Sequence, residues 1–405
     1  MPIPLLLLSD SPTSGTGLGR ITRDLAIRIA EHLPDVFRVG TLGYGGLQSR
    51  SLPFPQYPWQ SNPQWIVHEL QDVWADFAGS EQGIVMTIWD ASRLLWFSRP
   101  ETLNTDPALK AFLTNPPFKR WGYWPIDATG PNNKLTAILA HTIAGYDRNL
   151  AYSRWAEEIL ERTLPSNEFD NVPHGIDTSV FNPRHRGTAR HGFGQRLGIK
   201  NQKSGKFVAI PDDVSLIGIV ATNQVRKDYG LSIQAVMELK KTRKVVLWIH
   251  TDTLERHWSI PALLNDYGAQ WNENIVTCVP FSDDQMAWSY AACDLTMGIG
   301  NGEGFGFPIF ESIACGTPCL HGNYGGAPEH MPREMLVSQV GASRKQVRLE
   351  GPYNCLRGVY DPLDWAAAAE NILAKKMRTT LPPQLDWNGE LLWPRWEAWL
   401  RKGVA

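Results

Sequence analysis

The sequence predicts an α/β protein made of two Rossmann-like domains. Three observations favour this fold: an apolar run that leads into a glycine-rich loop, a second series of strands and helices in the later half, and a length of 405 residues, enough for two to three domains. Strands that alternate with helices form mostly parallel sheets. Each half of the chain is therefore expected to contain a parallel sheet covered by helices.

The first series begins with the apolar run 5–8, which is followed by a loop with glycines at 15, 17 and 19 and by apolar residues at 21, 25, 29 and 33. This order of strand, loop and helix is typical of sheets that handle nucleotides. We expect further strands over 83–89 and 120–125, and a helix over 144–163. The opening run has no basic flank and is too short for a signal peptide or a membrane-spanning helix.

The second series predicts strands over 215–220, 244–250 and 274–280 and a helix over 230–241. The segment 181–206, between the two series, has seven Lys or Arg and no acidic residue, so we interpret it as a linker with the boundary near 185. The expected domains are 1–185, 186–384 and a tail, 385–405. In the tail, Leu392, Trp396 and Trp399 can share one helix face, which we expect to pack back on the first domain.

The overall charge excludes a chain-wide basic field. There are 39 Lys and Arg against 41 Asp and Glu, a formal net charge of -2. Binding to nucleic acid or anionic lipid would therefore need a local patch. The five cysteines are an odd number and all lie in the second half, which indicates reduced thiols and a cytoplasmic location.

The clearest candidate site is the stretch 300–318, which has glycines at 300, 302, 304 and 306. Such glycines leave backbone N–H groups accessible, and the helix that follows points its positive N-terminus toward a ligand, so the pattern favours an anion site. Glu303 lies in the loop and Glu311 about two turns into the helix, so both can address one molecule. A carboxylate that accepts two vicinal hydroxyls is a usual way to hold a ribose.

The pair Glu303 and Glu311, in a Gly-Phe-Gly-x-Pro setting, resembles that of the retaining glycosyltransferases of the GT-B fold, family 4 (group 1). Four other features follow the order of that family: the loop 15–19, the stretch 173–177 with Phe181, the pair Arg226 and Lys227, and the stretch 325–329. The resemblance covers most of the chain. It implies two Rossmann-like domains that face each other across a cleft, with a C-terminal helix crossing back to the first.

The resemblance also implies roles for individual residues. Glu303 would contact the donor sugar and Glu311 the ribose, and Arg226 and Lys227 would neutralise the diphosphate leaving group. The other expected donor-binding residues are Gly17, Gly19, Gly304, Phe305 and Gly306.

Retention of configuration implies that the acceptor attacks from the face that the leaving group departs, and that the diphosphate takes the acceptor proton. The sequence contains no Asp-x-Asp metal motif and no nucleophile motif. We therefore expect metal-independent transfer that needs no cofactor, with a UDP-glucose or GDP-mannose type of nucleotide sugar as co-substrate.

Cys315, Cys319 and His321 lack a fourth ligand at suitable spacing and are interpreted as structural.

The chain departs from the family where many members have a histidine after a first-domain strand. Asp127 lies at that strand end and is the expected fourth catalytic residue, and Asp90 lies at another; either could hydrogen-bond the acceptor hydroxyl. Trp124, with Trp89 and Trp121, could stack on a sugar or a base. His141 is a weaker acceptor candidate.

The acceptor itself stays open among a small sugar or polyol, a lipid-linked glycan and a hydroxymethylated base in DNA. Basic residues of 184–206 could follow DNA phosphates, and the Trp-rich tail could make a peripheral membrane contact. A non-catalytic protein that binds a nucleotide sugar or glycan is the alternative of another class, which the intact Glu and basic pairs disfavour. A nicotinamide dehydrogenase is disfavoured because Arg20 replaces the last fingerprint glycine.

Overall fold

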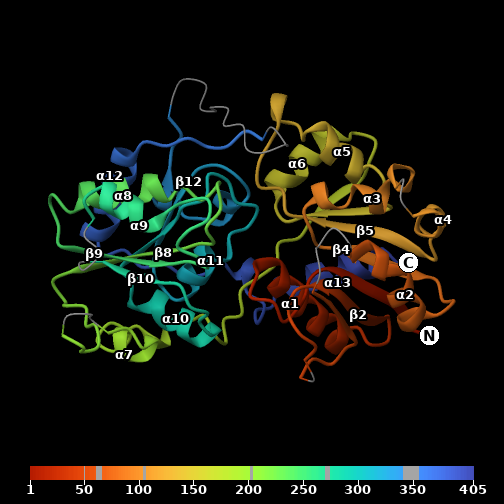
Figure 1. Cartoon of the computed structure of the whole chain (residues 1–405), viewed down its shortest axis with the longest axis horizontal. Helices are drawn as coiled ribbons and strands as arrows, with labels where there is room; N and C mark the ends of the chain where they lie inside the picture. Colours follow the sequence, from red (N-terminus) through yellow and green to blue (C-terminus); the bar gives the residue numbers. More distant parts are fainter. Residues whose placement is uncertain (50, 61–65, 104–105, 201–203, 270–273, 341–354) are drawn as a thin grey trace. The chain divides into compact units, whose positions relative to one another are not determined.

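Two parallel β-sheets organise the chain, and each belongs to its own unit in the computed structural model (Figure 1). The first unit comprises Met1–His174 and Pro394–Ala405, and the second comprises Gly175–Trp393. The structure describes residues 1–49, 51–60, 66–103, 106–200, 204–269, 274–340 and 355–405. The predicted α/β fold with two Rossmann-like halves is confirmed.

The first unit contains seven parallel strands in the order β3-β2-β1-β4-β5-β6-β7. The strands are β1 Ile3–Asp10, β2 Phe37–Tyr44, β3 Gln56–Trp59, β4 Gly83–Thr87, β5 Phe118–Trp124, β6 Arg148–Ala151 and β7 Phe169–Asn171. The helices are α1 Gly17–His32, α2 Ile66–Ala78, α3 Leu95–Ser98, α4 Pro107–Thr114, α5 Ala137–Ile143 and α6 Arg154–Thr163. The strand order reverses between β1 and β4, where open α/β sheets bind ligands.

The apolar run at the start of the chain forms the centre of this sheet. Leu6 and Leu8 join a core cluster with buried side chains of α2, α4 and α6. Leu5 and Leu7 are equally buried, and they point to the opposite face because side chains alternate along a strand. A strand covered on both faces has the continuous apolar sequence that was found here.

The predicted helix over 144–163 is wrong in its first half. Residues 148–151 form strand β6, which pairs with both β5 and β7, and the helix begins only at Arg154. Ser153 determines this start because its Oγ accepts a hydrogen bond from the N–H of Ala156 at 3.1 Å. The apolar residues of β6 and α6 are spaced, across the turn between them, much as they would be in a single helix. The two elements were therefore read as one, because a strand and a helix both bury their apolar residues.

The second unit contains six parallel strands in the order β10-β9-β8-β11-β12-β13. They are β8 Ser215–Val220, β9 Val245–His250, β10 Ile275–Thr277, β11 Leu295–Gly298, β12 Cys319–Gly322 and β13 Leu336–Val337. The helices are α7 Phe193–Leu197, α8 Tyr229–Leu239, α9 Ile260–Asp266, α10 Asp283–Ala292, α11 Phe307–Ala314 and α12 Pro362–Ala374. Figure 1 shows α8 and α12 on one face of the sheet and α10 and α11 on the other. The strand order reverses between β8 and β11.

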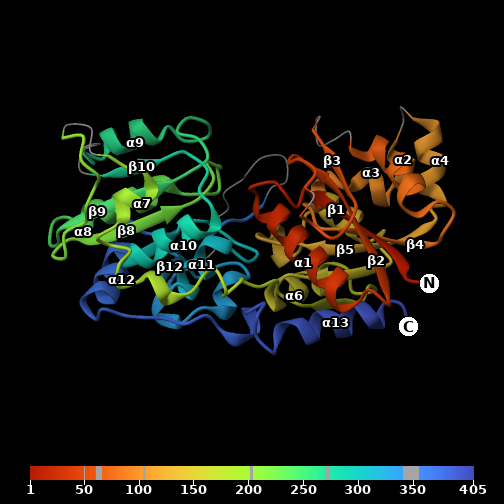
Figure 2. The same ribbon diagram turned by 90° about the horizontal axis from the view of Figure 1, so that it is seen from below.

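The last helix, α13 (Leu392–Lys402), runs along the first unit (Figure 2). The Trp396 ring packs edge-on against Tyr123 with ring centroids 4.9 Å apart, and Trp399 packs in the same way against Trp121 at 5.1 Å. The Trp396 Nε1 donates a hydrogen bond to the carbonyl of Pro173 at 2.9 Å. The two tryptophans therefore fill the sheet face beside β5.

The boundary between the units lies between His174 and Gly175 and not near 185. Residues 181–200 fold onto the second unit: Arg186 donates to Thr317 Oγ1 at 2.8 Å, and Arg190 pairs with Asp294 at 2.8 Å. A basic composition suggested a solvated linker because the acidic partners of these residues lie about 100 positions further along the sequence.

His250, at the end of β9, predicts a pH dependence of stability. Burial lowers the pKa of His250 to about 4, and its ring stacks on Phe281 with centroids 4.5 Å apart. Between pH 6.5 and 4 the unfolded chain therefore binds a proton that the folded protein does not, so the free energy of unfolding falls as the pH falls. Between pH 7.5 and 4.5 the free energy of unfolding of His250→Asn is expected to fall by about 2 kcal/mol less than that of wild type. Urea unfolding at the two pH values measures this difference.

The matched control for His250 is His141→Asn, because the His141 side chain is exposed. This variant should keep the pH dependence of the wild-type protein. An equal loss of stability between pH 7.5 and 4.5 in His250→Asn and wild type would contradict the assignment.

Candidate functional site

Three loops meet at the carboxyl edge of the second sheet, where strands β8, β11 and β12 lie side by side. The loop after β8 pairs with the loop after β11, since the N–H of Asn301 donates to the carbonyl of Arg226 and the N–H of Asp228 donates to Ile299, both at 2.9 Å. The loop after β12 joins through the N–H of Gly326, which donates to the carbonyl of Glu303 at 2.8 Å. The site therefore lies where the strand order reverses.

The centre of this site is a cluster of one carboxylate and two cations. Arg226 Nη1 lies 3.1 Å from Glu303 Oε2, and Lys227 Nζ pairs with the other oxygen, Oε1. Glu303 and Lys227 are 7% and 9% exposed. The structure thus brings together three residues that the sequence proposed for one site.

The electrostatics of the cluster follow from this geometry. Burial by itself raises the pKa of the Glu303 carboxyl, but the charges of Arg226 and Lys227 and the hydrogen bond from Lys227 outweigh it. The pKa of Glu303 is therefore held well below its usual range, and the carboxylate is ionised. Arg226 and Lys227 bring two cations together at the carboxyl edge of the second sheet, an arrangement that suits an anionic ligand.

Gly325 allows the close approach of the third loop to Glu303. Its φ is +104°, in the region that favours glycine, and a Cβ there would lie 2.5 Å from the Glu303 carbonyl oxygen. The N–H groups of Gly326 and Ala327 both point at that carbonyl. The Gly-Gly pair of the sequence therefore fixes the backbone of the central carboxylate.

Glu311 lies on α11 and accepts a hydrogen bond from Tyr290 Oη at 2.8 Å. It is 4% exposed, and Tyr290, on α10, is a partner that the sequence did not suggest. Phe305 is buried against Phe310, with ring centroids 4.7 Å apart, so its ring packs in the protein. Gly304 and Gly306 complete the turn into α11, where Gly306 has φ +89° and is the residue just before the helix.

His321 is a buried residue of this site that the sequence had suggested only as structural. It lies opposite Gly298 across the β11–β12 pair, and its Nδ1 donates to the Gly298 carbonyl at 2.6 Å. Burial lowers the pKa of His321, so the ring is neutral and its Nε2 is an acceptor, with no hydrogen-bond partner among the described residues. Cys315 and Cys319 are buried free thiols.

No group of three or more His, Cys, Asp or Glu side chains is arranged to hold a metal ion in the described part of the chain. Burial raises the pKa of Cys319 to about 12. This keeps the thiol protonated at neutral pH.

The glycine-rich loop of the first unit uses one of its backbone N–H groups within the protein. The N–H of Gly19 donates to the Thr16 side chain at 3.0 Å, so this group caps α1, whereas Gly17 is exposed at the helix start. Thr16 in turn donates to Asp10 at 2.6 Å, and Asp10 also accepts from Trp89 Nε1 at 3.1 Å. Asp10, at the end of β1, was missed, although its position directly after the apolar run could have identified it.

Two of the acceptor candidates lie at one edge of the first sheet. Asp90 is exposed and lies 3.8 Å from Arg93, and Asp127 is half-buried; they follow the neighbouring strands β4 and β5 at the carboxyl edge of the first sheet. His141 is exposed on α5.

The tryptophans predicted to stack on a ligand are buried, each at 1% exposure or less: Trp89, Trp121 and Trp124. Trp124 donates its Nε1 to Asn149 at 2.9 Å and packs on Tyr146. The stacking hypothesis is therefore wrong for these three rings, because they fill the interior of the first unit.

A buried polar group at the same edge was not predicted. Tyr152 follows β6, and its Oη is buried without a hydrogen-bond partner among the described residues. Burial raises the pKa of Tyr152 well above its usual value, and the charges of Asp90 and Asp10 raise it further. His174 packs edge-on against its ring at 4.6 Å.

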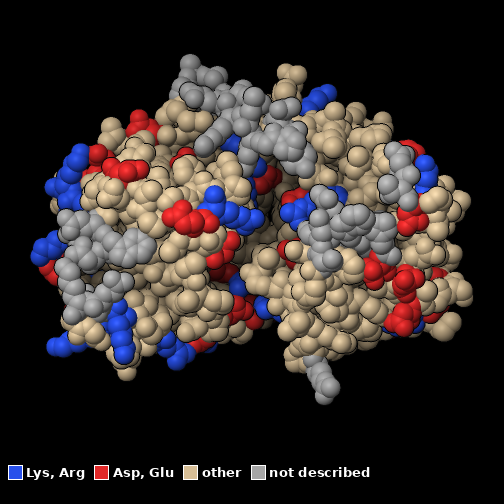
Figure 3. Space-filling view, viewed as in Figure 1, with Lys and Arg blue, Asp and Glu red and all other residues tan. Residues whose placement is uncertain are grey.

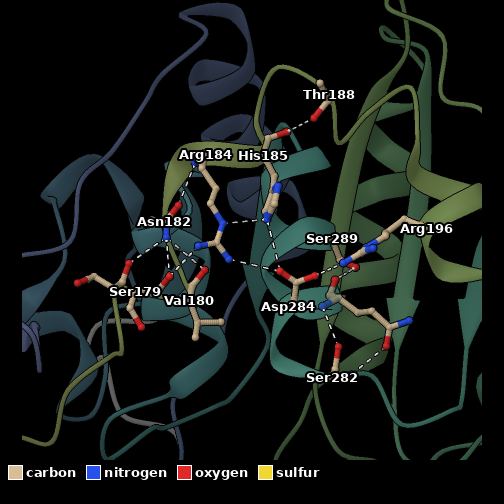
Figure 4. A network of polar contacts seen from close by, with 12 residues as sticks. Ser179, Val180, Asn182, Arg184, His185, Thr188, Arg196, Ser282, Asp284 and Ser289 are labelled. Atoms are coloured by element: carbon tan, nitrogen blue, oxygen red, sulfur yellow. Dashed lines mark hydrogen bonds and ion pairs between the residues drawn. The ribbon is translucent and has the colours of Figure 1, made fainter.

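Three basic residues of the segment 184–206 pair with acidic residues of their own unit: Arg184 and Arg196 with Asp284 (Figure 4), and Arg190 with Asp294. Arg184 lies 3.3 Å from Asp284 and Arg196 pairs with the same carboxylate, which the hydrogen bond from Arg196 keeps at a lowered pKa. Positions 201–203, which include Lys203, lie outside the described residues. On the face shown in Figure 3, Lys and Arg side chains are interspersed with Asp and Glu. This segment gives no support to a phosphate-binding track for DNA.

Arg190 is expected to matter for stability because it anchors this segment. Its guanidinium donates to Asp294 and to the Pro211 carbonyl, both at 2.8 Å, and is 16% exposed. Arg190→Met should lower the free energy of unfolding in urea by about 2 kcal/mol, whereas Arg184→Met, 47% exposed, should change it by less than about 0.5 kcal/mol. Equal effects would show that the segment is held in another way.

No helix in the described ranges is both long enough and apolar enough to cross a membrane. In the Trp-rich tail that was considered for a membrane contact, Trp387, Trp396 and Trp399 are buried, at 5%, 0% and 4% exposure, and Trp393 is half-buried.

The chain is similar in sequence to bacterial glycosyltransferases, while no family model matches it. It is 27% identical over 238 residues to D-inositol 3-phosphate glycosyltransferase of Xylanimonas cellulosilytica, which covers 57% of this chain and 50% of the relative. It is also 27% identical over 169 residues to the protein of that name from Mycolicibacterium smegmatis, covering 40% and 34%. The chain thus spans half or less of the length of these relatives.

Solved structures match the whole chain. Sucrose-phosphate synthase from Thermosynechococcus elongatus has a TM-score of 0.69 at 15% identity and covers 99% of both chains. Anabaena Alr3699/HepE in complex with UDP and glucose has a TM-score of 0.64 at 13% identity and covers 100% of both. Identities this low establish the fold alone, which is the GT-B fold.

Proposed function

We propose that this chain, a GT-B protein related to the group 1 glycosyltransferases, transfers a sugar from a nucleotide-diphosphate sugar to an acceptor hydroxyl. The observation that carries the proposal is the cluster of Arg226, Lys227 and Glu303 at the edge of the second sheet. Transfer of a glycosyl group releases a nucleoside diphosphate, and two fixed cations stabilise the negative charge that develops on it. A buried carboxylate beside them can accept hydrogen bonds from the sugar.

The donor we propose first is a UDP sugar, with GDP-mannose as the alternative. The support is that the similar Anabaena protein is bound to UDP-glucose in one structure and to UDP in another. Glu311 would accept hydrogen bonds from the ribose, since it is a buried carboxylate on the helix that follows the Glu303 loop. Gly304 and Gly306 would place their backbone near the phosphates.

The acceptor we propose is a small sugar or polyol. Asp10, Asp90 and Asp127 follow β1, β4 and β5, which are neighbours in the first sheet, and carboxylates of this kind suit a ligand rich in hydroxyl groups. The names of the relatives are consistent with a phosphorylated polyol. A lipid-linked glycan is the remaining alternative.

We further propose that transfer retains the anomeric configuration and needs no metal ion. Glu303 is ionised and held by two cations, so it is poorly suited to act as a free nucleophile, and the leaving diphosphate would take the acceptor proton. The positive charges of Arg226 and Lys227 would do the work that a divalent cation performs elsewhere.

The experiment begins with thermal unfolding in the presence of UDP, GDP and their sugars. A ligand at 100 times its dissociation constant stabilises the protein by about 2.7 kcal/mol, so the true donor should raise the melting temperature by several degrees. Purified protein is then incubated with that donor and a panel of sugars, polyols and polyol phosphates. The anomeric configuration of the product is read by NMR, with and without EDTA.

Product with the opposite configuration would exclude a retaining mechanism. Loss of activity in EDTA with recovery on adding manganese would exclude metal independence. Stabilisation by a nucleotide sugar without transfer or hydrolysis across the panel would favour the non-catalytic alternative.

A further inference from the structure

We propose that Glu303 competes with the diphosphate for Arg226 and Lys227, and that this competition helps to release the nucleoside diphosphate product. This role rests on the proposed function and adds to the contact of Glu303 with the donor sugar. It makes Glu303 a determinant of how tightly the site holds a diphosphate.

The geometry shows that one carboxylate engages both cations. Each of its two oxygens has its own partner: Arg226 Nη1 lies 3.1 Å from Oε2, and Lys227 Nζ pairs with Oε1. The Arg226 guanidinium also donates to the Gly302 carbonyl at 3.2 Å. Both cations are thus directed inward, toward the Glu303 loop.

The arrangement is fixed by the backbone on both sides. Lys227 and Gly300 form an antiparallel bridge, and Glu303 and Gly325 form a parallel one. Charged partners that are already held in place lose little conformational freedom when they pair, so the ion pairs are stronger than exposed ones of the same length. A diphosphate must therefore displace or share partners that are well satisfied.

Charge balance gives the direction of the effect. Arg226 and Lys227 carry two positive charges, and the Glu303 carboxylate pairs with both of them. A diphosphate brings at least two negative charges, so the carboxylate and the ligand repel each other at close range while both attract the same cations. The intact cluster binds a diphosphate strongly enough to assist its departure from the sugar, yet less tightly than the two cations alone would.

Two changes test this inference with inorganic pyrophosphate as the probe, since it has the diphosphate and no base, ribose or sugar. Glu303→Gln keeps the shape of the side chain and removes its charge. Gly300→Ala keeps the charge but moves it, because a Cβ on Gly300 would overlap the Glu303 carboxylate. Titration calorimetry should show that both variants bind pyrophosphate more tightly than wild type, by about tenfold for Glu303→Gln.

Matched controls come from the same unit. Glu370→Gln removes a carboxylate that pairs with Arg243 at 2.6 Å on α12, and Gly187→Ala adds a methyl group where no atom lies within 4 Å. Neither should change the affinity for pyrophosphate. Thermal unfolding of all four variants shows which of them are folded. If Glu303→Gln does not fold, Gly300→Ala alone provides the test.

The outcomes separate this inference from the proposed function. If wild type transfers sugar but the folded variants bind pyrophosphate no more tightly than wild type, the competition is wrong and the transferase stands. If the variants bind pyrophosphate more tightly than wild type, but wild type turns over no nucleotide sugar, the transferase proposal fails. The competition between Glu303 and a diphosphate then still stands. No measurable binding of pyrophosphate by any of these proteins also overturns the competition.

Discussion

Replacing Lys227 with methionine is expected to lower the rate of sugar transfer by a factor of about 100 to 1,000. Lys227 is nine-tenths buried in the cluster, where a positive charge acts on the leaving diphosphate through a medium of low dielectric constant. Methionine has a similar length and fills the space of the lysine stem. The turnover number and the Michaelis constant for the donor should both be measured, because the charge acts mainly on the transition state.

The control for Lys227 is Lys244→Met, which removes a lysine that is 73% exposed and pairs with Asp213. It should transfer sugar at the wild-type rate. If Lys227→Met is folded and keeps more than about a tenth of the wild-type turnover, the leaving-group role assigned to Lys227 is wrong.

Replacing Trp396 with alanine is expected to lower the free energy of unfolding of the first unit by about 3 to 5 kcal/mol. The ring is fully buried, packs against Tyr123 and Trp399, and donates a hydrogen bond to the Pro173 carbonyl at 2.9 Å. Alanine at this position leaves a cavity in place of the ring and removes the hydrogen-bond donor of the Pro173 carbonyl. Urea unfolding followed by circular dichroism measures the change.

The control for Trp396 is Leu391→Ala, because Leu391 is 56% exposed just before the helix, and its loss should cost less than about 0.5 kcal/mol. Trp396→Phe separates packing from hydrogen bonding and should lie between the two. A Trp396→Ala protein as stable as Leu391→Ala would mean that the helix does not stabilise the first unit.

In the second unit, the glycine-rich loop and the helix that follows it pointed to Glu303 and Glu311, and the family resemblance added Arg226 and Lys227 to the same site. Arg226, Lys227 and Glu303 each follow an apolar strand, and parallel strands bring their carboxyl ends to one edge. The sequence could not show that the two cations pair with Glu303 itself, since this depends on β8 and β11 being neighbours, which is a matter of strand order and not of local pattern. Tyr290, the partner of Glu311, was hidden for the same reason.

The first unit was harder to predict. Trp121 lies in the middle of β5, Trp124 at its end and Trp89 just after β4. Exposed and buried rings give the same sequence signal at these positions, and only the packing of the neighbouring elements shows that all three are interior. The segment 184–206 had an equally misleading composition, because charge pairs such as Arg190 with Asp294 join positions far apart in sequence. The acceptor role of Asp127 remains a prediction.

The division of the first unit between the two ends of the chain has a consequence for its synthesis. Residues 1–174 leave the ribosome before all of 175–393, and residues 394–405 come only after them. At about 5 to 20 residues per second the earlier part waits roughly 10 to 50 seconds for α13. During that time Trp121 and Tyr123 lack the rings of Trp399 and Trp396 that later cover them, so the nascent first unit presents an aromatic surface to chaperones and to other nascent chains. The second unit can complete its fold first, although its synthesis begins later.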